Sequence, residues 1–90
     1  METLTRAWRL NPQVALRPEP FGALAYHFRT RRLSFLKSRT LLEVVQTLDR
    51  HECAADACRA AGVGEEQLAA YERALATLAG SGMICERGEA

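Results

Sequence analysis

The sequence lacks a long hydrophobic segment. None of the apolar runs in the 90 residues approaches the roughly 18–20 residues that a membrane-spanning helix needs. The first twelve residues, METLTRAWRLNP, also lack the apolar centre of a secretory signal. We therefore expect no membrane contact and a cytoplasmic location.

Cysteine is scarce, and its spacing is uninformative about metals. The three cysteines, Cys53, Cys58 and Cys85, form no CxxC pair, and an odd number suits a reducing compartment better than a disulfide framework. His51 lies close to Cys53, but the spacing matches no standard zinc motif. We expect no metal and no cofactor.

Catalytic motifs are missing as well. The chain has no glycine-rich phosphate loop and no HExxH, and its serines have no recognisable histidine and carboxylate partners in the sequence. His27 alternates with alanines on a predicted strand, which favours a solvated or hydrogen-bonded histidine over a catalytic base. These absences favour a binding domain over an enzyme.

What the sequence does contain is an uneven charge. The net charge is only +1, yet residues 1–48 hold eight cations and three anions, while residues 49–90 hold four cations and eight anions. Residues 29–40, RTRRLSFLKSRT, carry five cations and no anion around a short apolar centre. Such a stretch can contact nucleic acid, protect an exposed strand edge or dock an acidic partner.

Alternating patterns predict three strands, over residues 13–17, 23–28 and 32–38. The intervening PEPFG is rich in turn formers. Within the second and third strands, the larger apolar side chains each share one side. We expect an antiparallel meander with one buried, apolar face. The larger side chains Leu24, Tyr26 and Phe28 share one side of the second strand, whereas it stays open which of Leu33, Ser34, Phe35 and Leu36 face the core.

The period changes to a helical one at residue 40. Thr40 and Glu43 have the spacing of a capping box, and helices are predicted over residues 41–50, 54–61 and 65–79, with Gly62 ending the second. The order predicts an α+β fold, a three-stranded antiparallel β-meander followed by three helices that cover its apolar face. The domain should span residues 11–85, between flexible tails at 1–10 and 86–90.

Two binding functions fit this order. In a nucleic-acid-binding domain the third helix would enter the major groove, but its first turns carry Glu65, Glu66 and Glu72 against Arg73 alone. In a peptide-binding domain the unpaired edge of the third strand would accept an extended peptide as a further strand. The acidic third helix favours the peptide.

The segments VALRPEPFGALAYHFRTRRLSFLKSRTLLEVV, AAGV and AYERALATLAGSGM make the chain similar to a known family. Over about residues 10–84 it closely resembles the mycofactocin-system chaperones of the MftB family and, more distantly, the PqqD-like RiPP recognition elements. The resemblance implies a winged-helix-like fold without catalysis. It also implies a chaperone in mycofactocin biosynthesis that binds a precursor peptide and presents it to a radical SAM maturase.

The resemblance further implies a site and partners. An acidic, MftA-like precursor would add to the third strand and lie against the third helix. An MftC-like maturase would be the second partner, and we expect no nucleic-acid partner. One register pairs the N–H of Ser34 with the peptide, and the same edge could join two copies as a homodimer. The implied peptide-binding residues are Arg29, Arg31, Arg32, Leu33, Ser34, Phe35, Leu36, Lys37, Gln67, Tyr71, Ala74 and Leu75.

Overall fold

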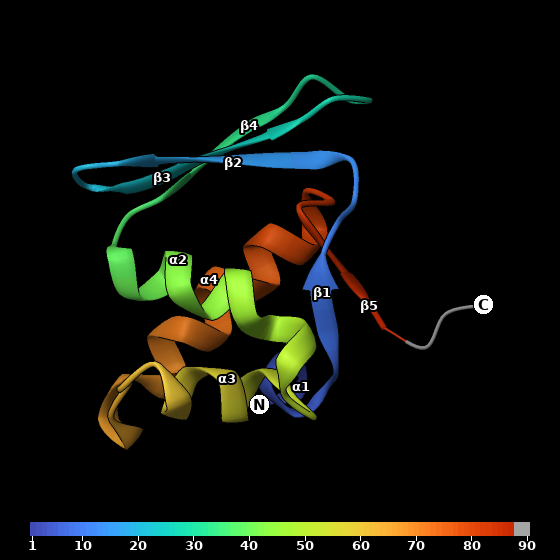
Figure 1. The fold of residues 1–90 in the computed structure, drawn as a ribbon. Coiled ribbons are helices and arrows are strands. Elements are labelled where there is room, and N and C mark those ends of the chain that lie inside the picture. The colour runs from blue at the N-terminus through green and yellow to red at the C-terminus, as the bar shows by residue number, and fades with distance from the viewer. Residues whose placement is uncertain (88–90) are drawn as a thin grey trace.

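The computed structural model describes residues 1–87, and it has an α+β fold in which one sheet lies over a layer of helices (Figure 1). Strands β2, β3 and β4 form an antiparallel sheet in that order, and β1 and β5 form a second, two-stranded one. The predicted fold class is confirmed. The elements are α1 (Glu2–Thr5), β1 (Trp8–Leu10), β2 (Val14–Glu19), β3 (Gly22–His27), β4 (Leu33–Leu36), α2 (Arg39–Thr47), η1 (Leu48–Arg50), α3 (Ala54–Ala60), η2 (Glu65–Gln67), α4 (Leu68–Gly80) and β5 (Ile84–Glu86).

Strand β3 of the larger sheet buries its small side chains rather than its large ones, and β4 buries Leu36 on the same face. Ala23, Ala25 and Leu36 are 0–1% exposed on the face toward the helices, whereas Leu33 and Phe35 are 60% and 59% exposed on the opposite face. For β3, the expectation that the helices cover its larger apolar side chains was therefore wrong. For β4, whose orientation the sequence left open, Leu36 faces the helices. Small residues on β3 let the helical layer approach the sheet closely, so that apolar side chains of α2 and the following η1 fill the space beneath it: Leu41, Val44, Val45 and Leu48.

The two turns of the meander are held by specific contacts. Gly22 has a φ of +150°, and a side chain there would collide with the Leu36 carbonyl oxygen and the Ser38 backbone, so only glycine fits. At the other turn, Nδ1 of buried His27 accepts hydrogen bonds from the backbone N–H groups of Arg29 and Thr30, at 3.2 and 3.3 Å. His27 thus shapes the basic turn that leads into β4.

The helices begin and end at identifiable caps. The Ser38 Oγ accepts the Leu41 N–H at 3.0 Å, so the N-cap of α2 lies two residues before the cap predicted at Thr40. Gly62, with φ of +92°, ends α3 as predicted, and the Val63 N–H donates to the Cys58 carbonyl at 3.0 Å.

The N-terminal segment is part of the folded core, so the expectation of a flexible tail over residues 1–10 was wrong. Leu4 is 2% exposed and Trp8 8%, and the Trp8 indole Nε1 donates to the Thr3 carbonyl at 2.8 Å. Strand β1 pairs with β5, with Trp8 opposite Glu86. Two large apolar side chains are enough to dock a short segment whose sequence shows no sustained period.

The C-terminal expectation is corrected in part. Glu86 belongs to β5, and the Arg87 backbone N–H donates to the Ala7 carbonyl at 2.9 Å. The rest of the tail predicted over residues 86–90 lies outside the described residues.

Candidate peptide-binding groove

Strand β4 lies at one edge of the larger sheet, and its hydrogen-bonding direction can be assigned. The His27 N–H donates to the Arg32 carbonyl at 3.0 Å, in line with the β3–β4 register. In an antiparallel pair, residues that exchange hydrogen bonds alternate with residues that do not. The backbones of Ser34 and Leu36 therefore bond to β3.

The intervening residues face the open edge. By the same alternation, the N–H and C=O groups of Leu33 and Phe35 point away from β3. Outside the sheet ladder, none of the hydrogen bonds within residues 1–87 uses these groups. They offer two donors and two acceptors to an added strand. The Ser34 N–H, which one of the registers left open by the sequence would pair with the peptide, is used within the sheet.

The opposite edge of the sheet is a poorer template. On β2, the residues that point outward are Val14, Leu16 and Pro18, because the Phe28 N–H donates to the Gln13 carbonyl and fixes the alternation. Pro18 has no N–H, and the Val14 N–H already donates to the Asn11 carbonyl at 2.9 Å. Proline at an edge strand discourages further pairing, so β4 is the edge that remains available.

A groove runs between the β4 edge and α4. It consists of two adjoining hollows of about 350 and 190 Å³ that share Lys37, Leu41 and Ala74. The larger hollow is lined in part by β4, and the smaller hollow extends to the start of α4. Their remaining lining residues are Ser34, Phe35, Ser38, Ala70, Tyr71, Thr77 and Leu78.

The structure brings five of the implied site residues to this groove. Ser34, Phe35 and Lys37 line it from β4 and its end, and Tyr71 and Ala74 line it from α4. All are at least partly exposed, so a bound chain can reach them.

Other implied residues lie elsewhere. The side chains of Leu36 and Leu75 are 0% exposed and belong to the core, and Leu33 lies on the outward face of the sheet. Gln67 is exposed on η2, where its Oε1 accepts the Gly64 N–H at 3.2 Å, and it does not line either hollow. A buried side chain cannot select a peptide, although the Leu36 backbone still supports the edge.

The basic side chains frame the edge rather than line the groove. Arg29, Arg31 and Arg32 are exposed in the turn before β4, and of the implied cations only Lys37 lines the hollows. Within residues 1–87 none of these four side chains makes an ion pair, so their charge is available to a ligand.

Sequence reasoning missed several groove residues. Ala70, Thr77 and Leu78 come from α4, and Ser38 and Leu41 come from the start of α2. A signal for the α4 wall was present, since Ala70, Ala74 and Thr77 repeat at helical spacing as small residues on one face. Small side chains leave room beside a strand, and that room is the groove.

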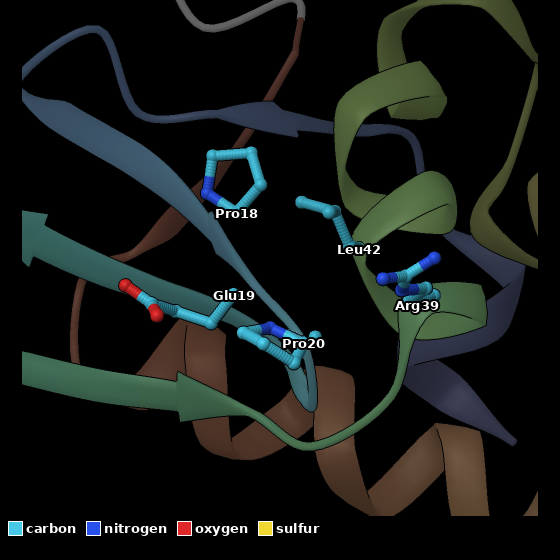
Figure 2. A pocket seen from close by; sticks show the side chains of 6 residues that line it. Pro18, Glu19, Pro20, Arg39 and Leu42 are labelled. Atoms are coloured by element: carbon cyan, nitrogen blue, oxygen red, sulfur yellow. The ribbon is translucent and has the colours of Figure 1, made fainter.

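A separate hollow of about 450 Å³, outside the groove, lies between the β2–β3 turn and the start of α2 (Figure 2). Figure 2 shows the Glu19 carboxylate pointing away from Arg39 and Leu42, and Glu19 is already paired with Arg17 at 2.6 Å. The prolines Pro18 and Pro20 contribute no N–H donors there. The hollow is larger than either part of the groove, but it lacks convergent polar groups and an open strand edge.

Residues 1–87 contain neither a candidate membrane-spanning helix nor a candidate metal site. No helix is long and apolar enough to cross a membrane. No group of three or more histidine, cysteine, aspartate or glutamate side chains is arranged to hold a metal ion.

A comparison with protein families identifies the family of this chain. The model of the peptide chaperone MftB family matches residues 7–85. The chain belongs to this family. The predicted family resemblance is confirmed, and the matched range includes β1 through nearly all of β5, with the whole groove inside it.

Three relatives in this family are each called "Peptide chaperone MftB". The protein of Mycobacterium ulcerans (strain Agy99) is 61% identical over 79 residues, which cover 88% of this chain and 72% of the relative. That of Mycobacterium tuberculosis (strain ATCC 25618 / H37Rv) is 60% identical over 82 residues, covering 91% and 75%. That of Mycolicibacterium smegmatis (strain ATCC 700084 / mc(2)155) is 58% identical over 78 residues, covering 87% and 76%.

The family name bears on the class of function. A peptide chaperone has a binding role rather than an enzymatic one, in agreement with the prediction that the chain is not an enzyme. No solved structure matches the chain significantly.

Proposed function

We propose that this chain binds an acidic precursor peptide as an added strand on the β4 edge. The observation that carries the proposal is the open edge at Leu33 and Phe35, directly beside the groove against α4. Strand addition supplies main-chain hydrogen bonds, while neighbouring pockets select alternate side chains. Membership of the peptide chaperone MftB family supports the same role.

The groove determines which peptide side chains would be selected. A peptide paired with β4 continues the sheet, so every second side chain points toward the helical layer and into the hollows. Those hollows are bounded by Leu41, Tyr71 and Ala74, with Lys37 at their shared part. The volumes of about 350 and 190 Å³ leave room for apolar side chains of the peptide in both hollows.

The cations would position an acidic peptide rather than supply most of its affinity. Each exposed ion pair with Arg29, Arg31, Arg32 or Lys37 contributes at most ~1 kcal/mol. At physiological salt the interaction is screened beyond about 8 Å. We therefore expect salt to slow association while leaving the ladder and the groove to hold the peptide.

The finer assignment follows the family resemblance. The peptide would be an MftA-like precursor, and the chain would present it to an MftC-like radical SAM maturase in mycofactocin biosynthesis. The acidic side chains Glu65, Glu66 and Glu72 around the start of α4 speak against nucleic acid as the partner. The three free thiols, Cys53, Cys58 and Cys85, suit a cytoplasmic location.

Isothermal titration calorimetry with the precursor peptide tests the proposal. We expect saturable binding by the full chain. The affinity should fall only a few-fold between roughly 50 and 300 mM salt, a range that includes the physiological ionic strength. A glutamate-to-glutamine version of the peptide is the matched control and should bind several-fold more weakly. No binding at about 100 μM, with the maturase absent and present, would contradict the proposal. Sedimentation without peptide would show whether two copies pair at the same edge instead.

A further inference from the structure

The outward face of the β2–β3–β4 sheet is apolar and uncovered. Figure 1 shows all the helices on the other side of this sheet. Leu33, Phe35 and Phe28 are each about 60% exposed, at 60%, 59% and 59%, and Phe21 is 47% exposed. A monomeric protein rarely leaves such a contiguous group of large apolar side chains in water without a partner.

This face is also pre-organised. The Phe21 and Phe35 rings lie 6.1 Å apart between centroids, and the Tyr26 and Phe28 rings lie 5.6 Å apart in a T-shaped pair. Leu24, Tyr26 and Leu33 line a hollow of about 340 Å³ on the same face. Aromatic side chains that already pack against one another lose little conformational freedom when a partner covers them, so binding costs less entropy. Aromatic residues are also enriched at the energetic centre of protein interfaces.

The charge around the face indicates the kind of partner. Residues 14–36 form the sheet and its two turns, and they hold four cations and one anion. The anion, Glu19, is paired with Arg17 at 2.6 Å. Two copies packed face to face would bring two basic rims together, whereas a protein with an apolar surface rimmed by carboxylates would match both the centre and the edge.

The face is continuous with the proposed peptide site. Leu33 and Phe35 direct their backbone groups to the open edge and their side chains to this face. A peptide added to β4 extends the sheet, so every second peptide side chain lies on the same outward face. A protein that covers the face would therefore contact the bound peptide as well.

We propose that the outward face of the sheet, centred on Phe21, Tyr26, Phe28, Leu33 and Phe35, docks the enzyme that modifies the bound peptide, through an apolar surface of that enzyme rimmed by carboxylates. The inference rests on the proposed function, because it takes the modifying enzyme as the partner. Peptide and enzyme then share one sheet: the peptide occupies its edge and the enzyme its face. Bound peptide enlarges the surface that the enzyme contacts, so peptide and enzyme bind with positive coupling.

The test measures the binding of the radical SAM maturase and of the precursor peptide separately, using the full chain. Phe28→Ser removes an exposed ring that lies outside the groove. We expect it to leave peptide affinity within about two-fold and to weaken maturase binding about tenfold or more. Arg17→Glu reverses a charge on the same face and should weaken maturase binding several-fold, while Arg50→Glu, on η1 and away from the sheet, is its control.

Each outcome distinguishes this inference from the proposed function. Maturase affinity unchanged in both Phe28→Ser and Arg17→Glu overturns the docking face. A wild-type dimer that Phe28→Ser dissociates assigns the face to a second copy and also overturns it. A wild-type chain that binds maturase but no peptide contradicts the proposed function, and the loss of maturase binding in the two variants then still supports the face. A wild-type chain that binds neither overturns both.

Discussion

The carboxylate of Glu72 on α4 accepts the backbone N–H of Leu4 in α1 at 2.9 Å. Its second oxygen accepts the Thr3 N–H at 3.1 Å. These bonds satisfy two donors at the start of α1 that have no partner inside so short a helix. The N-terminal segment is thereby fastened to the helix that forms one wall of the groove.

Glu72→Gln should lower the free energy of unfolding by about 1 kcal/mol, the usual net contribution of a hydrogen bond. Urea unfolding measures this, with Glu43→Gln on the exposed side of α2 as a control that should change little. An unchanged midpoint in Glu72→Gln would contradict the role of the carboxylate.

The same contact predicts a dependence on pH. Partial burial acts to raise the pKa of Glu72, but hydrogen bonds from the Leu4 and Thr3 backbones outweigh it and leave the pKa below its ordinary value of 4.5. A carboxyl whose pKa is lower in the folded state stabilises the fold above its unfolded pKa, and this contribution is lost as the pH falls through the folded value. The difference between wild type and Glu72→Gln should therefore be constant near pH 7 and shrink below about pH 4.5.

The register of β4 predicts opposite effects of proline at neighbouring positions. Phe35→Pro removes an N–H that faces the open edge, so the protein should stay folded while peptide affinity falls about tenfold beyond the effect of Phe35→Ala. Ser34→Pro removes an N–H that bonds to β3 and should destabilise the fold itself. Circular dichroism and calorimetry separate the two effects. Equal peptide affinity in Phe35→Pro and Phe35→Ala would place the peptide elsewhere.

The width of the groove predicts the effect of filling it. Ala74 lines both hollows, so Ala74→Leu should occupy their shared part and weaken peptide binding about tenfold or more. Ala76→Leu makes the same chemical change at an exposed position of α4 outside the groove, and it should leave the affinity unchanged. Calorimetry on both variants is decisive, because a loss shared equally by the two would reflect the helix rather than the groove.

Gly22 and Gly80 should respond differently to alanine. Gly22→Ala forces a side chain against the Leu36 carbonyl and the Ser38 backbone at a φ of +150°, and it should cost about 2 kcal/mol or more. Gly80→Ala meets open space at the end of α4 and should stabilise by a few tenths of a kcal/mol, since alanine is the better helix former. Denaturant midpoints give both values, and a Gly22→Ala protein of wild-type stability would contradict the close approach.

Local chemistry made much of the fold predictable. Proline and glycine between residues 18 and 22 indicated the first turn, and alternation on both sides indicated its strands. The helical period after residue 40 and Gly62 indicated the helices, because these signals act between residues close in the sequence. The helical spacing of three small residues, Ala70, Ala74 and Thr77, also indicated one wall of the groove. That they line a groove depends on which strand lies opposite them in the fold.

The sequence by itself determined the order of the three meander strands and the three main helices after them, the basic stretch around β4 and the family to which the chain belongs. The tertiary structure decided which face of the sheet is buried, because alternation is symmetric: Ala23 and Ala25 or Leu24 and Tyr26 could have faced the helices. It also decided that Leu33 and Phe35, not Ser34, present their backbone to the open edge, since that depends on a register shared with β3. The docking of Leu4 and Trp8 was likewise decided there, because their partners lie about seventy residues away along the chain or further.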